Sequence, residues 1–164
     1  MFYFFFLIIR PPPRSTLFPN TPLFRSEPPP VALGRGETVL FVDDEPALVE
    51  LGEAMLAALG FQPVGVESGE RALAAFRAAP QRFELVITDQ LMAKMTGLEL
   101  AAAIRELRPE IPIVLTSGRG DARLTDQARQ HGIREILKKP LLSRELSECA
   151  ARALGRTRDA RPPA

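Results

Sequence analysis

The sequence predicts an α/β fold in which helices cover both faces of a five-stranded parallel sheet. Two observations lead to this expectation. From residue 37 onward, five short runs of β-branched and apolar residues alternate with five longer segments whose apolar residues recur at helical spacing. The runs are also almost continuously apolar, as expected of parallel strands that are buried on both faces.

The first pair shows the pattern most clearly. The run TVLFVDD, residues 38–44, predicts a strand that ends in two acids, and the segment 47–60 predicts a helix. Gly60 stands where a helix C-cap is expected. The apolar stripe expected on this helix consists of Leu48, Leu51, Met55 and Leu59.

Four more pairs follow in the same order. Written as strand and then helix, they are FQPVGVES with GERALAAFRAA, FELVITD with GLELAAAIRELR, IPIVLTS with residues 122–131, and EILKK with SRELSECAARAL. The expected globular domain therefore spans residues 37–155.

The two ends differ in composition from this domain. Residues 1–36 begin with the apolar MFYFFFLII and continue with two PPP runs, which predicts a disordered, proline-rich leader. The apolar start is too short to span a bilayer, which needs about 20 residues, and it lacks the features of a signal peptide. A fusion scar or a start codon placed too far upstream are the alternatives. Residues 156–164 predict a disordered tail.

Composition excludes several classes of function. Cys149 and His131 are the single residues of their types, so no internal disulfide or histidine-rich metal site is expected, and the chain is interpreted as cytoplasmic. The formal net charge is +1, and the positive surplus lies at the two ends. The mildly acidic middle argues against direct nucleic-acid binding.

Polar residues gather where the predicted strands end. Asp43 and Asp44 end the first strand and Asp89 the third, while the fourth and fifth end in the pairs 116–117 and 138–139, Thr-Ser and Lys-Lys. In an open parallel sheet, ligands bind outside the carboxyl ends of the strands. Clustered carboxylates repel one another and need positive charge, which a lysine and a hard cation with oxygen ligands, most commonly Mg²⁺, would supply.

Four motifs carry a resemblance to a known family. They are VDDEP at 42–46, ITDQLMAKMTGLEL at 87–100, IPIVLTSG at 111–118 and KKP at 138–140. Together they resemble the receiver domains of two-component response regulators over residues 38 to 154. The resemblance implies a flavodoxin-like doubly wound sheet with strand order 2-1-3-4-5, and a phosphoacceptor signalling role rather than an enzyme acting on a separate substrate.

The resemblance also implies the site. Asp89 matches the phosphoacceptor, Asp44 a direct Mg²⁺ ligand, Asp43 a ligand acting through water, and the main-chain carbonyl of Leu91 a further ligand. Lys139 matches the family lysine. The resemblance further implies that the chain has a histidine kinase or histidine phosphotransfer protein and a downstream protein as partners. It implies a monomer or weak dimer, either a stand-alone receiver or one detached from a hybrid sensor kinase.

The switch hydroxyl is assigned by spacing. The family places it five residues beyond a proline like Pro112, which selects Ser117 over Thr116. Two positions depart from the family pattern. Ala93 replaces the usual proline, so a looser loop is expected, and Ile136 replaces the usual aromatic residue, so a different output signal is expected.

Two alternatives come from other functional classes. A docking module would keep the fold without being phosphorylated, and the intact acids, Ser117 and Lys139 argue against it. A magnesium-dependent phosphohydrolase of similar topology would need a second acid two residues beyond the nucleophile, where this chain has Leu91.

Overall fold

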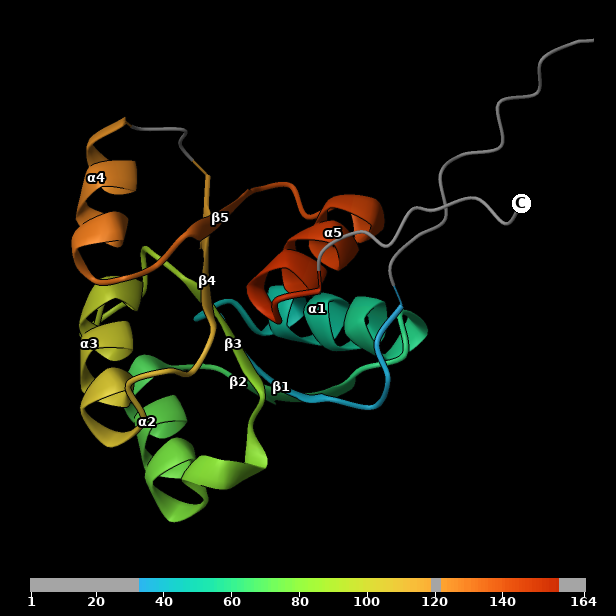
Figure 1. Ribbon diagram of the computed structural model, residues 1–164, viewed down its shortest axis with the longest axis horizontal. Coiled ribbons are helices and arrows are strands. Elements are labelled where there is room, and N and C mark those ends of the chain that lie inside the picture. The colour runs from blue at the N-terminus through green and yellow to red at the C-terminus, as the bar shows by residue number, and fades with distance from the viewer. Residues whose placement is uncertain (1–32, 119–121, 157–164) are drawn as a thin grey trace, which may run out of the picture.

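A computed structural model describes residues 33–118 and 122–156 (Figure 1). Most of the expected leader, residues 1–32, and most of the expected tail, residues 157–164, lie outside the described part of the chain. None of the described helices is long and apolar enough to cross a membrane.

The described elements alternate as the sequence predicts. The strands are β1 (Thr38–Val42), β2 (Gln62–Val66), β3 (Leu85–Asp89), β4 (Ile113–Ser117) and β5 (Glu135–Lys138). The helices are α1 (Pro46–Ala58), α2 (Gly69–Ala78), α3 (Gly97–Leu107), α4 (Ala122–Gln130) and α5 (Ser143–Ala153), with a short 3₁₀ turn, η1 (Pro80–Arg82).

The strands form one parallel sheet in the order β2-β1-β3-β4-β5, which confirms the predicted topology. Helices α1 and α5 lie on one face of this sheet, and α2, α3 and α4 lie on the other (Figure 1). Each face therefore buries its own layer of apolar side chains.

Alternate residues of each strand enter the two core layers. On β1, Val39 and Phe41 pack with Leu56 of α1 and with α5, whereas Leu40 and Val42 pack on the side of α2, α3 and α4. This alternation follows from the two-residue side-chain period of a strand. It explains why the strands are apolar throughout.

The stripe expected on α1 is confirmed only in part. Leu59 is buried and Met55 packs partly buried against the core, but Leu51 is exposed. Gly52, which the expected stripe did not include, is buried instead. The cause is a close approach, because a Cβ at residue 52 would lie 2.5 Å from Cζ of Phe41. The side of α1 that carries Gly52 therefore faces the sheet. The spacing of leucines alone does not reveal this orientation of the helix.

The two described ends of the chain meet at the corner where β1 begins. The N–H groups of Gly34 and Gly36 donate to the carbonyls of Leu59 and Gly60, at 2.7 and 3.0 Å. Arg156, which follows α5, donates to the carbonyl of Leu33 at 3.0 Å and pairs with Glu37. Residues 33–37 and Arg156 are called the terminal clasp below.

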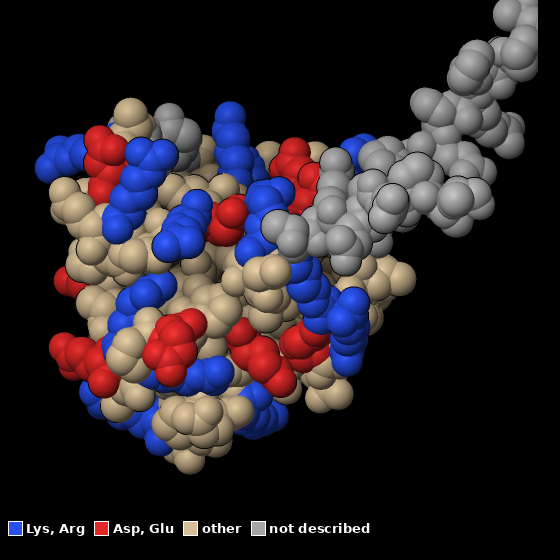
Figure 2. Space-filling view, in the orientation of Figure 1, with Lys and Arg blue, Asp and Glu red and all other residues tan. Residues whose placement is uncertain are grey.

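Basic and acidic side chains are interleaved on the surface seen in Figure 2. This face carries no continuous basic surface of the kind that follows a nucleic-acid backbone.

Candidate functional site

The polar residues predicted at the strand ends meet at the carboxyl edge of the sheet. Asp43 follows β1 and Asp89 ends β3, the neighbouring strand. Ser117 ends β4, and Lys139 follows β5 directly. Because the strands are parallel, four separate segments deliver their polar groups to one place.

Lys139 joins two of the carboxylates. Its Nζ lies 2.7 Å from Oδ2 of Asp43 and 2.9 Å from Oδ1 of Asp89. Both acids are almost fully buried, with 1% and 5% of their surface exposed. Burial by itself lowers the pKa of Lys139, but hydrogen bonds and charge from the two aspartates outweigh it and raise the pKa above its usual value. Lys139 is therefore an ammonium ion at neutral pH.

The second oxygen of each buried acid accepts a backbone hydrogen bond. The N–H of Glu45 donates to Oδ1 of Asp43 at 3.1 Å, and the N–H of Leu91 donates to Oδ2 of Asp89 at 3.0 Å. Each carboxylate is thus held at both oxygens, which fixes its orientation.

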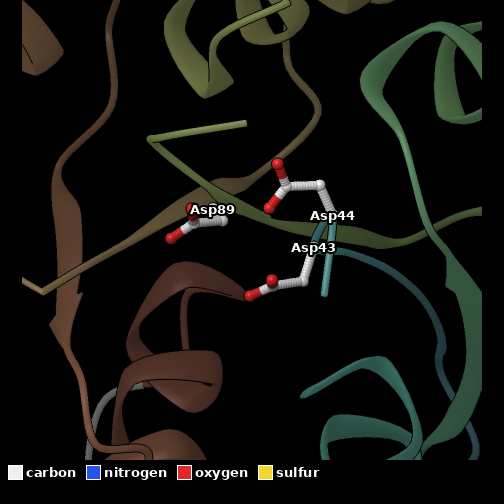
Figure 3. Close-up of side chains that lie close together, drawn as sticks. All are labelled: Asp43, Asp44 and Asp89. Atoms are coloured by element: carbon white, nitrogen blue, oxygen red, sulfur yellow. The ribbon is translucent and has the colours of Figure 1, made fainter. Parts of the chain in front are cut away.

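Asp44 completes a cluster of three carboxylates (Figure 3). It is exposed, and one ligand oxygen from each of Asp43, Asp44 and Asp89 lies within 4.8 Å of the others. Its Oδ2 accepts the N–H of Ala93 at 2.9 Å. Three clustered carboxylate oxygens fit a hard divalent cation such as Mg²⁺. Because Asp44 is open to solvent, such a cation could keep part of its water shell.

Thr116 contributes a contact that the spacing argument did not predict. Its Oγ1 donates to Oδ1 of Asp89 at 3.2 Å, and both side chains are buried. The two residues are paired across β3 and β4. Ser117, the hydroxyl selected by spacing, is 5% exposed, and its carbonyl accepts the N–H of Lys139 at 2.9 Å.

A family model for the response regulator receiver domain matches residues 39–151, nearly the whole of the sheet and its helices. The chain belongs to the response regulator receiver family. Among curated relatives, the two-component response regulator ORR25 of Oryza sativa subsp. japonica is 32% identical over 68% of this chain and 16% of its own length. The sensor histidine kinase GacS of Pseudomonas protegens is 32% identical over 80% of this chain and 15% of its own length.

Solved structures agree with this family. A response regulator receiver domain protein from Clostridium thermocellum has a TM-score of 0.69 and 26% identity, covering 73% of this chain and 95% of that one. The chemotaxis protein CheY4 of Vibrio cholerae has a TM-score of 0.68 and 26% identity, covering 72% and 98%. This receiver thus spans almost all of two solved receiver structures but less than a fifth of ORR25 and GacS.

The loop after β3 has little free space where α3 begins. Helix α3 begins at Gly97 with a capping box formed by Thr96 and Glu99. A Cβ at residue 97 would overlap the main-chain carbonyl of Asp89 and lie 2.9 Å from a methyl group of Leu115. Glycine therefore lets the start of α3 pass directly beside the end of β3.

The remaining predicted positions are located as follows. Lys138 is exposed, so the fifth strand contributes Lys139 alone to the carboxylates, and the peptide bond between Lys139 and Pro140 is cis. Ile136 is half-buried and packs on the core layer that contains Leu115 and Leu124. The side chain of Leu91 is 68% exposed.

Proposed function

We propose that this receiver accepts a phosphoryl group on Asp89 from a phosphohistidine and thereby acts as the phosphoacceptor of a two-component phosphorelay. One observation carries the proposal: the Asp89 carboxylate ends a buried strand, is oriented at both oxygens, and shares one ammonium ion with a second buried acid. A purely structural ion pair would not need a third carboxylate within 4.8 Å of the other two.

The proposed transfer is an in-line displacement at phosphorus. An oxygen of Asp89 forms a bond to phosphorus while the phosphorus–nitrogen bond of the phosphohistidine breaks, and the imidazole keeps the bonding electron pair. The product is an acyl phosphate. Lys139 lies within 3 Å of the acceptor oxygen and remains charged, so it can move from the carboxylate to a phosphoryl oxygen as negative charge gathers there.

The divalent cation would be held by Asp44, Asp89, the main-chain carbonyl of Leu91 and, through water, Asp43. The clustered oxygens of the three carboxylates support this assignment. A bound Mg²⁺ would neutralise charge on the transferring phosphoryl group. The protein's own contribution is to hold the three acids together before the donor arrives.

Ser117 is the proposed switch hydroxyl. It lies at the end of β4, the strand next to β3, and a phosphoryl group on Asp89 would bring additional acceptor oxygens to this edge of the sheet. A modification shifts a conformational equilibrium only through such differential contacts. Thr116 already donates to Asp89, so we assign it the separate role of orienting the carboxylate.

The proposed donor is a histidine kinase or a histidine phosphotransfer protein, and the proposed output is binding of a downstream protein by a monomer or weak dimer in the cytoplasm. Similarity to part of the sensor histidine kinase GacS supports a hybrid-kinase setting, and the match to nearly all of CheY4 supports a stand-alone one.

Two other functions are less well supported. An unphosphorylated docking module would have no use for Lys139 held between two buried acids. A magnesium-dependent phosphohydrolase needs a general acid close to its nucleophile, and the residue two positions after Asp89 is Leu91, whose apolar side chain points to solvent.

The test is incubation with acetyl phosphate and Mg²⁺, followed by intact-mass measurement. We expect one added phosphoryl group on the unaltered protein and on Ser117→Ala, and none on Asp89→Asn. The matched control is Asp126→Asn, which changes an exposed acid on α4 that pairs with Arg129, and this variant should react normally. Absence of the adduct on unaltered protein, together with no Mg²⁺-dependent binding of beryllium fluoride, would favour the docking module.

A further inference from the structure

The exposed carboxylate of the cluster is held differently from the two buried ones. Lys139 contacts Asp43 and Asp89. Asp44 takes instead the main-chain N–H of Ala93, at 2.9 Å from its Oδ2. This bond joins the turn after β1 to the loop after β3, two segments 49 residues apart in sequence.

The loop conformation directs that N–H toward the acids. Two of its amides, those of Leu91 and Ala93, donate to Asp89 and Asp44 respectively. Immediately after them, Lys94 adopts a left-handed conformation with φ of 67°, and the N–H of Met95 donates back to the carbonyl of Ala93 at 2.8 Å. A non-glycine residue is rarely left-handed, because its Cβ then crowds the following carbonyl oxygen, so the surrounding contacts must favour this turn.

We infer that the main-chain N–H of Ala93 is a positioning group for Asp44 as a cation ligand, an inference that rests on the proposed function. A hydrogen bond to one oxygen of a carboxylate fixes the direction of the other, and such supporting bonds raise metal affinity. Proline at position 93 could not make this bond because it has no N–H. A looser loop is expected because residue 93 is alanine. The hydrogen bond from the Ala93 N–H to Asp44, which proline could not make, restrains the loop instead.

The first test compares Mg²⁺ affinity among variants at residue 93, measured by isothermal titration calorimetry. Ala93→Pro removes the N–H, and we expect its Kd for Mg²⁺ to rise about tenfold. Ala93→Ser keeps the N–H and should stay within about twofold of the unaltered protein. Equal or tighter binding by Ala93→Pro would overturn the inference.

A backbone ester at residue 93 separates loss of the N–H from the constraint of a proline ring. Replacing Ala93 by lactic acid keeps the methyl group and deletes only the donor, so it should weaken Mg²⁺ binding as Ala93→Pro does. An ester variant with unchanged Kd would contradict the inference even if Ala93→Pro were misfolded.

Amide hydrogen exchange provides a readout that does not depend on metal. In metal-free protein, Asp44→Ala should speed exchange at the Ala93 N–H, whereas Asp126→Asn should not. An exchange rate at the Ala93 N–H that Asp44→Ala leaves unchanged would overturn this inference but not the proposed function. Failure of the unaltered protein to bind Mg²⁺ would instead contradict the proposed function, and this inference with it.

Discussion

Lys139 supplies positive charge to two of the three clustered carboxylates. Its ammonium group lies within 3 Å of two carboxylates that are almost fully buried. Removing one partner of such a group leaves uncompensated buried charge, which is far more costly than losing an exposed ion pair.

Lys139→Met should therefore lower the free energy of unfolding by about 3 kcal/mol in EDTA, measured by urea denaturation. Lys138→Met, at the exposed neighbouring position, should change it by less than about 0.5 kcal/mol. Because the pKa of Lys139 is raised, its contribution should be complete below about pH 10.4 and be lost as pH rises through the raised value. Equal effects of the two substitutions would contradict this role.

Cys149 offers a second prediction at the scale of one residue. Burial, with the nearby charge of Glu135, raises the pKa of its thiol to about 12, and Arg152 only partly opposes this. The native thiol should therefore resist Ellman's reagent at pH 8, whereas protein unfolded in guanidinium should react at once. Because the unfolded thiol ionises at a lower pH, stability should also fall as pH rises from the ordinary thiol range toward 12. Rapid labelling of native protein would show that the thiol is accessible.

The site residues differ in how well the sequence could reveal them. Asp43, Asp89 and Lys139 follow from strand ends alone, because parallel strands bring their carboxyl ends to one edge. Thr116 does not, since its contact with Asp89 depends on the register between β3 and β4. The Ala93 N–H is a backbone group, and residue identity says little about where it points.

At the scale of elements, the start of α3 limits the space around the end of β3. We predict that Gly97→Ala will destabilise the domain by about 1–3 kcal/mol, because its methyl group would meet backbone that cannot easily move. Gly118→Ala is the matched control, since an added Cβ there meets no atom of the described residues within 4 Å. Its effect should be below about 0.5 kcal/mol. Urea denaturation of both variants measures the difference, and similar values would argue against crowding at Gly97.

Element order and topology could be predicted because strand and helix periodicities differ and each run is bounded clearly. The side of α1 that faces the sheet could not be predicted, because its buried stripe includes a glycine. Apolar periodicity favours Leu51, yet the ring of Phe41 needs the space that Gly52 leaves. Packing between α1 and β1 decides which residues of α1 are buried, and the sequence of neither segment shows this packing alone.

At the scale of the whole molecule, cation binding should stabilise the folded state. Mg²⁺ that binds only the native acid cluster adds about 2.7 kcal/mol at one hundred times its Kd. We expect the thermal midpoint of the unaltered protein to rise with Mg²⁺ concentration and to rise further with beryllium fluoride. Asp44→Asn should show little of this response, whereas Asp126→Asn should respond fully. A NaCl series of equal ionic strength separates specific binding from screening.

The terminal clasp determines how this domain can be built into larger chains. Leu33 and Arg156 are hydrogen-bonded to one another at the amino edge of the sheet, whereas Asp89 lies at the carboxyl edge. A neighbouring domain joined near Leu33 or near Arg156 would therefore attach at the same corner of the domain, away from Asp89. The same adjacency makes the domain suited to circular permutation, because a short bridge could connect these two residues while new ends are opened in an exposed loop.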